Sequence, residues 1–323
     1  MTRSMRFSEA INEAISEEME LDPTVVCLGE DISFGGPFTV TRGLKDRFGE
    51  SRVLDTPIAE ETIAGAALGA TITGLRPIAE IGFADFLMVC MDQVVNQIAK
   101  WRYVSGGQTK VPLVIRSATG GGAGLGCQHS QSLEALFVHI PGLKVVAPST
   151  PRDAKGLMKA SVRDDNPVLF MEHKLLYGLR GDVPEECVIP LGTADIKREG
   201  QDVTVVATME MVHKTLHAAE KLEEDGISVA VVDPRTLVPL DKRTILDSVK
   251  KTGRLVIASE ECKRGSVASE IAATVGEECF DYLDAPILRV ASLDTPIPFS
   301  VTLEENMIPQ VQDIVRAVKE IMA

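Results

Sequence analysis

The feature that most constrains the fold is the alternation of short apolar runs with longer amphipathic segments. In the first half of the chain, apolar runs of strand length cover residues 24–28, 77–81, 111–115, 143–147 and 168–171. Helix-length segments lie at 8–19, 84–103 and 151–162. Continuous Val, Ile and Leu runs separated by helices are typical of a parallel sheet that helices cover on both faces. This half therefore predicts an α/β domain.

The same alternation restarts after an acidic segment that contains Pro and Gly, residues 184–200, which we interpret as a linker. Further strands are expected at 203–207, 228–232, 255–259 and 287–291, and helices at 209–224, 242–251 and 265–275. The predicted organisation is a domain over 1–185, a linker over 186–200 and a smaller α/β domain over 201–323. A length of 323 residues agrees with two domains at roughly 150 residues each.

Charge and hydropathy exclude several classes of protein. The chain has 33 Lys and Arg against 47 Asp and Glu, a net charge of −14, which argues against binding to nucleic acid or to an anionic membrane. The longest weakly polar run, 63–75, is shorter than the ~20 residues of a membrane-spanning helix. The acidic, amphipathic N-terminal segment does not resemble a secretory signal, and the six cysteines form no CxxC pair. We expect a cytoplasmic protein with reduced thiols.

Segment 84–103 carries apolar residues around nearly its whole circumference, which indicates a helix in a core or a subunit interface. For a chain of this length we favour the interface. In 64–74, small residues recur every four positions and allow a helix backbone to approach its neighbour closely.

The segment DTPIAEE (55–61) runs from a strand end into this small-residue helix. In one interpretation Asp55 or Thr56 caps the helix and Glu60 only interacts with its N-terminal dipole. In the other, Glu60 is a carboxylate among apolar and small residues, where desolvation would suit it to proton transfer. The sequence leaves both open.

A glycine run, 120–126, precedes Gln128-His129-Ser130-Gln131. The run resembles a phosphate cradle but lacks the GK[ST] of a P-loop, so we expect a flexible loop. His129 is either structural or an acid–base group near neutral pH. No motif of a serine hydrolase, a zinc protease or a kinase is present. The acidic segment 163–167 could hold a divalent metal, but adjacent acids before a proline more often form a solvated turn.

Many ordered blocks give the chain a resemblance to a known family. They include GEDISFGG (29–36), DTPIAE (55–60), GLRPIAEI (74–81), QHSQSLEA (128–135), RDDNPVLFMEHKLLYG (163–178) and SLDTPIPFS (292–300). Together they resemble the beta subunit of the thiamine-diphosphate-dependent decarboxylating component of 2-oxo acid dehydrogenase complexes, a family that includes pyruvate, branched-chain and acetoin dehydrogenases. The resemblance implies a transketolase-like pyrimidine-binding domain followed by a transketolase C-terminal-type domain.

The resemblance also implies roles for individual residues. Glu60 corresponds to the glutamate that hydrogen-bonds N1′ of the aminopyrimidine ring, and Phe86 to the aromatic residue that packs on the ring. Ile58 is expected beside the cofactor, and His129 is expected to assist acyl transfer to the lipoyl group. A potassium site, built largely from backbone carbonyls, would use Leu113, Ser161, Val162, Asp164 and Asn166.

The implied partners are an alpha subunit, in an α2β2 tetramer, and the lipoyl-bearing dihydrolipoyl acyltransferase core. The alpha subunit would supply the segment that holds the diphosphate through Mg²⁺, which this sequence lacks. EHKLLYG (172–178) and GDVPEE (181–186) favour acetoin as substrate, whereas IGFADF (81–86) and VASEIAATVGEECF (267–280) favour a branched-chain 2-oxo acid. Acetoin is preferred, with pyruvate and branched-chain 2-oxo acids as alternatives. A non-catalytic docking subunit and a Rossmann-type nucleotide enzyme are the alternatives of other classes.

Overall fold

A computed structural model describes residues 2–323, which form two compact units. The first unit comprises the residues up to 119 together with 136–191, and the second comprises 120–135 and 192–323. The sequence-based division differs at 120–135, which it places in the first domain. The structure assigns this glycine-rich loop to the second unit, because its backbone is hydrogen-bonded to glutamates of that unit.

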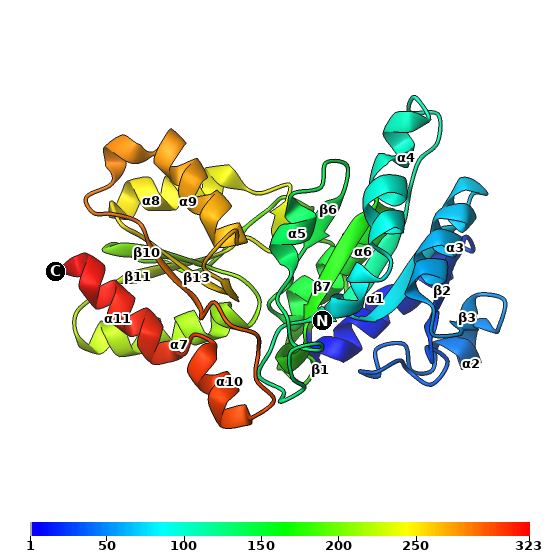
Figure 1. The fold of residues 1–323 in the computed structure, drawn as a ribbon, viewed down its shortest axis with the longest axis horizontal. Coiled ribbons are helices and arrows are strands. Elements are labelled where there is room, and N and C mark those ends of the chain that lie inside the picture. The colour runs from blue at the N-terminus through cyan, green and yellow to red at the C-terminus, as the bar shows by residue number, and fades with distance from the viewer. Residues whose placement is uncertain (1) are drawn as a thin grey trace. The chain divides into compact units, whose positions relative to one another are not determined.

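The first unit is built on a parallel sheet with strand order β6-β7-β5-β4-β2-β3 (Figure 1). A separate antiparallel pair joins β1 and β8. The strands of this unit are β1 (Thr2–Arg6), β2 (Val25–Glu30), β3 (Val53–Thr56), β4 (Arg76–Phe83), β5 (Val114–Thr119), β6 (Lys144–Val146), β7 (Val168–His173) and β8 (Arg180–Pro184). The fully buried Val, Ile and Leu of β5 and β7 explain why the continuous apolar runs predicted a sheet covered on both faces.

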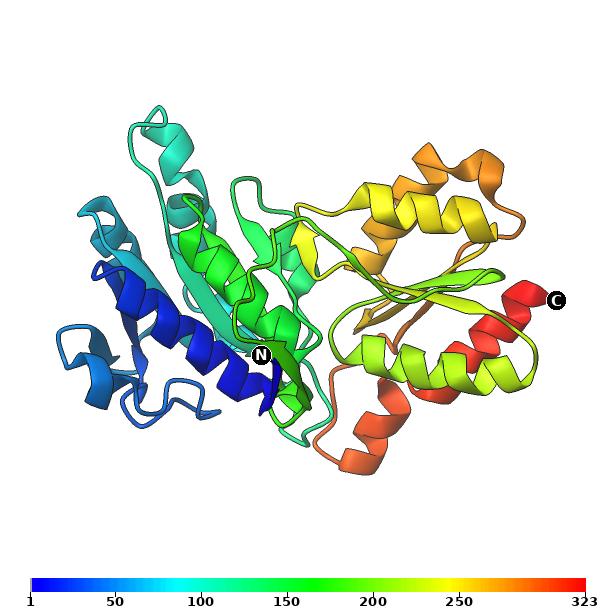
Figure 2. The ribbon, with the colours of Figure 1, turned by 180° about the vertical axis from the view of Figure 1, so that it is seen from behind.

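Helices cover both faces of this sheet. Helices α1 (Phe7–Leu21) and α6 (Pro151–Arg163) lie side by side on one face, and α3 (Glu60–Ile72) packs with η2 (Gln93–Ile98) on the other (Figures 1 and 2). The buried Lys155 joins α6 to α1, because its Nζ lies 2.6 Å from Glu13 Oε1 and 2.8 Å from Glu17 Oε1. The remaining helices are α2 (Leu44–Phe48), η1 (Ala84–Met88), α4 (Ala99–Val104), α5 (Glu134–Val138) and η3 (Lys174–Leu176).

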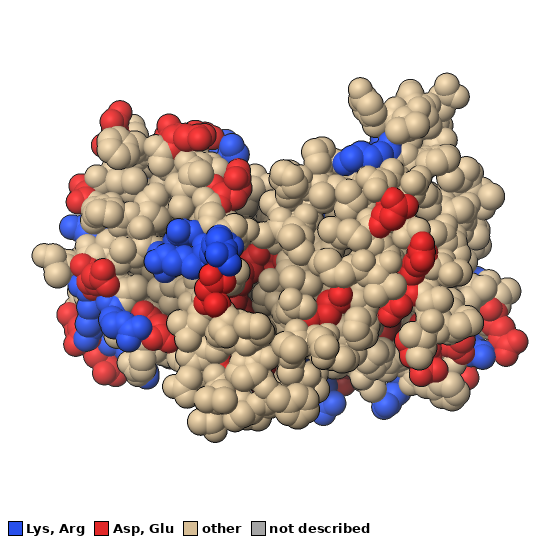
Figure 3. Space-filling model, in the orientation of Figure 1, with Lys and Arg blue, Asp and Glu red and all other residues tan. Residues whose placement is uncertain are grey.

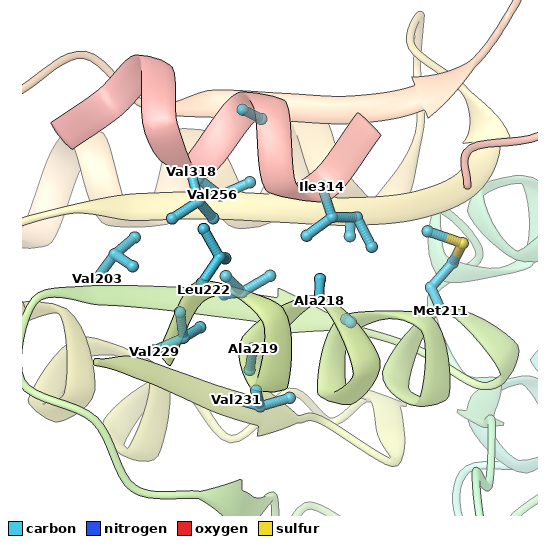
Figure 4. Close-up of a cluster of buried hydrophobic side chains, with 14 of the residues drawn as sticks. Val203, Met211, Ala218, Ala219, Leu222, Val229, Val231, Val256, Ile314 and Val318 are labelled. Carbon is cyan, nitrogen blue, oxygen red and sulfur yellow. The ribbon is translucent and has the colours of Figure 1, made fainter. Parts of the chain in front are cut away.

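The second unit contains a sheet with strand order β14-β13-β10-β11-β9, in which only β9 runs antiparallel to its neighbour. Helices α7 and α11 cover one face and α8 and α9 the other (Figures 1 and 2). Figure 4 shows the core between α7, α11 and the sheet, where Leu222 and Val318 meet Val256. The elements are β9 (Asp195–Arg198), β10 (Val203–Ala207), α7 (Glu210–Glu224), β11 (Val229–Asp233), β12 (Thr236–Val238), α8 (Lys242–Thr252), β13 (Leu255–Cys262), α9 (Val267–Glu278), η4 (Phe280–Tyr282), β14 (Leu288–Ser292), α10 (Val301–Met307) and α11 (Val311–Met322).

Two sequence-based expectations about local structure are wrong. The predicted linker 186–200 contains a strand, β9, which pairs with β11 and so belongs to the second sheet. The single helix predicted at 84–103 is divided into the 3-10 helix η1, the π-helix η2 and the α-helix α4. A segment that is apolar on all sides gives no angular signal, so its composition does not distinguish these helix types.

The structure also bears on membrane and disulfide expectations. Within residues 2–323, no helix combines the length and the apolar character that crossing a bilayer needs. All six cysteines are free, as the sequence predicts, with four of them buried and Cys127 and Cys262 exposed.

Candidate functional site

Three strand ends meet at the carboxyl edge of the first sheet. Because β2, β3 and β4 are parallel neighbours, Glu30, Thr56 and Phe83 end their strands at the same edge, and Glu30 and Thr56 are register partners. Open α/β sheets bind ligands at this edge. The Thr56 hydroxyl is buried and has no hydrogen-bond partner in the part of the chain that the structure describes. A buried polar group without a partner fits an edge that receives a ligand group.

Glu60 lies at this edge as the first residue of α3, four positions after Thr56, and is half-buried. The N-cap residue of α3 is Ala59, and no side-chain cap hydrogen bond is present, so the interpretation in which Asp55 or Thr56 caps the helix is wrong. Asp55 instead accepts a hydrogen bond from the Ser33 backbone N–H at 2.8 Å. The residues that precede Glu60 therefore provide no side-chain cap for α3.

The Glu60 carboxylate contributes to the pKa shifts of two neighbouring groups, Glu30 and Cys90. Burial raises the pKa of Glu30, and the negative charges of Asp31 and Glu60 raise it further. Burial also raises the pKa of the Cys90 thiol to about 12, with additional contributions from Glu60 and Glu61. Cys90 is therefore a protonated, packed thiol near neutral pH, and the acidic groups of β2 and α3 share one edge.

The adjacent acid Glu61 has a different environment. Its carboxylate is exposed and accepts a hydrogen bond from Gln93 Nε2 at 3.1 Å, which joins α3 to η2. Successive residues of a helix point about 100° apart, so Glu60 and Glu61 cannot face the same group. Glu61 is thus a natural control for Glu60.

Aromatic and apolar side chains accompany the carboxylates. Phe86, in η1, is half-buried and packs edge-to-face on Phe83, with ring centroids 5.7 Å apart. Phe83 in turn packs on Phe38 at 5.5 Å. Ile58 precedes α3 and is 74% exposed.

A buried ion network lies behind this edge on β4, β5 and β7. Arg116 donates to both oxygens of Glu172, at 2.8 and 2.6 Å, and also to Glu80 Oε2. The Tyr177 hydroxyl donates to Glu172 at 2.8 Å, and its ring stacks on Phe38. Burial raises the pKa of Glu80 to about 7, opposed by the charge of Arg116 and assisted by that of Glu172. Burial, with a smaller contribution from Glu172, therefore keeps part of the Glu80 population protonated near neutral pH even beside Arg116.

Glutamine at position 80 is expected to remove a pH-dependent loss of stability. The folded chain keeps the Glu80 proton from its ordinary pKa of 4.5 up to about 7, whereas the unfolded chain releases it, so stability falls with rising pH in this window. The difference in the free energy of unfolding, E80Q minus wild type, should therefore increase by about 2 kcal/mol when the pH is raised from 5.5 to 8.5. Urea denaturation followed by circular dichroism measures it, with the exposed Glu186→Gln as control. An advantage that does not change with pH would contradict the assignment.

His129 lies in the second unit, on the loop that follows β5. It is half-buried, and its backbone N–H donates to the Gly126 carbonyl at 3.3 Å. Gly121 donates its N–H to Glu260 at 2.6 Å, so the expectation of a freely flexible loop is wrong. The loop borders a cavity of about 570 Å³ within this unit, lined in part by Gln128, Ser132, Glu260, Cys262 and Asp294.

The residues expected to form a potassium site lie at the opposite end of the first unit, between the end of α6 and the starts of β5 and β7: Leu113, Ser161, Val162, Asp164 and Asn166. The Leu113 carbonyl accepts the Val168 N–H at 2.9 Å. The carbonyls of Val162 and Asp164 accept hydrogen bonds from Arg76 at 3.0 and 3.2 Å. Arg76 thus already donates to two of the carbonyls that the potassium hypothesis uses.

The aspartates of 163–167 are ion-paired. Asp164 pairs with Lys144, and Asp165 pairs with Lys110 at 2.6 Å and Arg76 at 2.9 Å. Within residues 2–323, no group of three or more His, Cys, Asp and Glu side chains is arranged to hold a metal. These pairs agree with the interpretation of this segment as a polar turn.

Comparisons with known proteins identify the fold and the family. Residues 3–180 match the transketolase pyrimidine-binding domain, and residues 192–314 match the transketolase C-terminal domain. A solved structure described as a split-gene transketolase, an inactive beta4 tetramer, superposes with a TM-score of 0.82 at 26% identity over 98% of both chains. The class that the fold defines is therefore a transketolase-like α/β protein of two domains.

Curated relatives narrow this class. The chain is 49% identical to the 2-oxoisovalerate dehydrogenase subunit beta of Bacillus subtilis over 98% of both proteins. It is 48% identical to the acetoin:2,6-dichlorophenolindophenol oxidoreductase subunit beta of Cupriavidus necator, and 45% identical to a pyruvate dehydrogenase E1 subunit beta of Arabidopsis thaliana. The chain belongs to the beta subunits of the 2-oxo acid and acetoin dehydrogenases, which confirms the resemblance read from the sequence.

Sequence reasoning missed Glu30 and Glu304 and considered Thr56 only as a helix cap. Glu30 and Thr56 are register partners at the carboxyl edge, a pairing that depends on which strands are neighbours. Glu304 accepts hydrogen bonds from the glycine run 180 residues away. Glu304 stands beside Glu305 in the sequence, which gives no signal to separate the buried glutamate from the exposed one.

Proposed function

We propose that this chain is the beta half of a thiamine-diphosphate enzyme that cleaves the C–C bond next to a carbonyl. The acyl group would pass to the lipoyl group of a partner acyltransferase. The observation that carries this proposal is the half-buried Glu60 at the carboxyl edge of the first sheet, where the Thr56 hydroxyl has no partner. An acid at this edge, in a beta subunit of this family, is suited to contact a ring whose chemistry depends on proton placement.

Thiamine diphosphate, when bound, supplies the electron sink that such a cleavage needs. The Glu60 carboxyl would hydrogen-bond N1′ of the aminopyrimidine and control the proton there. Phe86 and Ile58 would provide apolar contact to the cofactor, which agrees with the half-buried ring of Phe86 and the exposed side chain of Ile58. His129 would act as an acid–base group during acyl transfer.

An alpha subunit would complete the site in an α2β2 assembly and hold the diphosphate through Mg²⁺. Large exposed apolar side chains on the first unit support a partner chain, with Tyr103 88% and Val104 74% exposed at the end of α4. The carbonyl set at Leu113 and 161–166 is proposed to hold potassium. We place the assembly in the cytoplasm, with a lipoyl-bearing acyltransferase core as its second partner.

Acetoin is the substrate that we propose. The segments 172–178 and 181–186 favour acetoin enzymes, and the acetoin relatives match this chain at 48% identity over its whole length. The branched-chain relative matches at 49%, so overall identity does not separate the two substrates. A branched-chain 2-oxo acid is therefore the second candidate, favoured by segments 81–86 and 267–280.

The chain co-expressed with its alpha subunit is expected to turn over acetoin with a kcat/KM about 10-fold or more above those for pyruvate and 2-oxoisovalerate. The products separate the candidates, because acetoin releases acetaldehyde whereas the 2-oxo acids release carbon dioxide. Reduction of an added lipoyl domain measures acyl transfer in each case. Carbon dioxide release without acetaldehyde would reassign the substrate, and an assembled pair that acts on none of the three would contradict the enzymatic proposal.

A further inference from the structure

The glycine run is bound by buried carboxylates of its own unit. Both oxygens of Glu304, in α10, accept backbone N–H groups of the loop: Oε1 from Gly122 and Oε2 from Gly124, each at 2.8 Å. Glu304 is 1% exposed. Glu260 accepts the Gly121 N–H at 2.6 Å and the Ser132 hydroxyl at 2.9 Å, on the two sides of His129. Glu304 thus binds two alternate glycines of the run, and Glu260 binds one residue before His129 and one after it.

This arrangement explains why the run resembles a phosphate cradle. Backbone N–H groups that converge in a glycine-rich turn form a concave site for an anion. In this chain the anion is a glutamate side chain, which occupies the N–H groups that a phosphate would need. These hydrogen bonds argue against a nucleotide at this loop. They indicate that the glycines serve the structure of the loop by binding a carboxylate side chain.

The glycines also allow the loop to lie directly against the segment that leads into and through α10. A Cβ at Gly126, where φ is +76°, would lie 2.7 Å from the Phe299 ring, and one at Gly121 would lie 2.6 Å from Ile308 Cδ1. A side chain at either position would therefore require the Phe299 ring or the end of the Ile308 side chain to move, and at Gly126 the positive φ adds backbone strain. Phe299, just before α10, is 76% exposed and Leu303, in α10, is 59% exposed, and the face visible in Figure 3 is largely uncharged there.

We propose that Glu304 is a positioning residue for His129, an inference that rests on the role of His129 in the proposed function. Gly124 is held only five residues before His129, and charge-assisted hydrogen bonds to both Glu304 oxygens restrict the conformations of the intervening chain. Glu304 does not touch substrate in this scheme. It acts by keeping the imidazole in the place where acyl transfer uses it.

Glu304→Gln tests this role with little change in shape. The amide keeps one oxygen acceptor but presents an NH₂ group to the second backbone N–H, so one hydrogen bond is lost and two donors oppose each other. We expect backbone hydrogen–deuterium exchange over 120–132 to increase about 10-fold or more in the assembled protein. The neighbouring, exposed Glu305→Gln is the matched control and should leave this exchange unchanged. Unchanged exchange in E304Q would overturn the inference.

Partial reactions test the link to His129. E304Q should slow acyl transfer to a lipoyl domain about 10-fold or more, while exchange of the cofactor C2 proton, assigned to Glu60 in the other unit, stays within about 2-fold of the wild type. In a His129→Ala background, E304Q should cause no further loss of transfer, because coupled residues are not additive. Equal losses with and without His129 would overturn the positioning role.

A second variant and a wild-type control distinguish failure of this inference from failure of the proposed function. If E304Q does not fold, Glu304→Asp, which keeps the carboxylate but shortens its reach to the Gly122 and Gly124 N–H groups, gives the same two readouts. A wild-type pair that shows no acyl transfer would contradict the proposed function, whereas the loop exchange in E304Q would still support or overturn the anchoring by Glu304.

Discussion

Replacing Glu60 with glutamine is expected to slow exchange of the C2 proton of thiamine diphosphate by about 100-fold or more in the complex with the alpha subunit. The carboxyl group can both donate and release a proton at N1′, whereas an amide has no titratable proton. Glu60 is half-buried at the first position of α3, so the change removes an acid without opening a core cavity. Quenched-flow exchange followed by NMR measures the rate directly.

The adjacent Glu61→Gln provides the control for this result. Glu61 is exposed and bonded to Gln93, and its side chain points about 100° away from that of Glu60. E61Q should therefore keep an exchange rate close to that of the wild type. An unchanged rate in E60Q, or equal losses in both variants, would exclude the proposed role of Glu60 and favour a non-catalytic docking subunit.

Strand positions were largely predictable because buried parallel strands carry continuous apolar runs. The run at 203–207 coincides with β10, and that at 168–171 lies within β7. Short strands at sheet margins gave no such signal: β9 (Asp195–Arg198) is polar, half-buried and placed by its pairing with β11. An element whose stability comes from a partner strand cannot be recognised from its own composition.

The sequence proposes candidate site residues but cannot show their surroundings. The sequence could not decide between a capping and a functional interpretation of DTPIAEE, since both use the same residue types near a helix start. The structure excludes the cap and adds Thr56 and Glu30 through strand order. Likewise, the glycine run suggested flexibility because its anchors, Glu260 and Glu304, are distant in the sequence.

Charge at the carboxyl edge predicts that this chain alone cannot hold a diphosphate. Glu30, Asp31, Asp55 and Glu60 are acidic residues near the strand ends. Burial raises the pKa of Glu30, and the negative charges of Asp31 and Glu60 raise it further. A cofactor with a multiply charged tail would add like charge to this edge. The cation and the donors that bind the tail are therefore expected from the alpha subunit.

Calorimetric titration of thiamine diphosphate with Mg²⁺ tests this shared site most directly. The isolated chain should bind the cofactor about 100-fold or more weakly than the chain mixed with its alpha subunit, because the contacts to the tail are missing. It should also show no turnover until the alpha subunit is added. Equally tight binding by the chain alone, or sustained activity without a partner, would contradict the account.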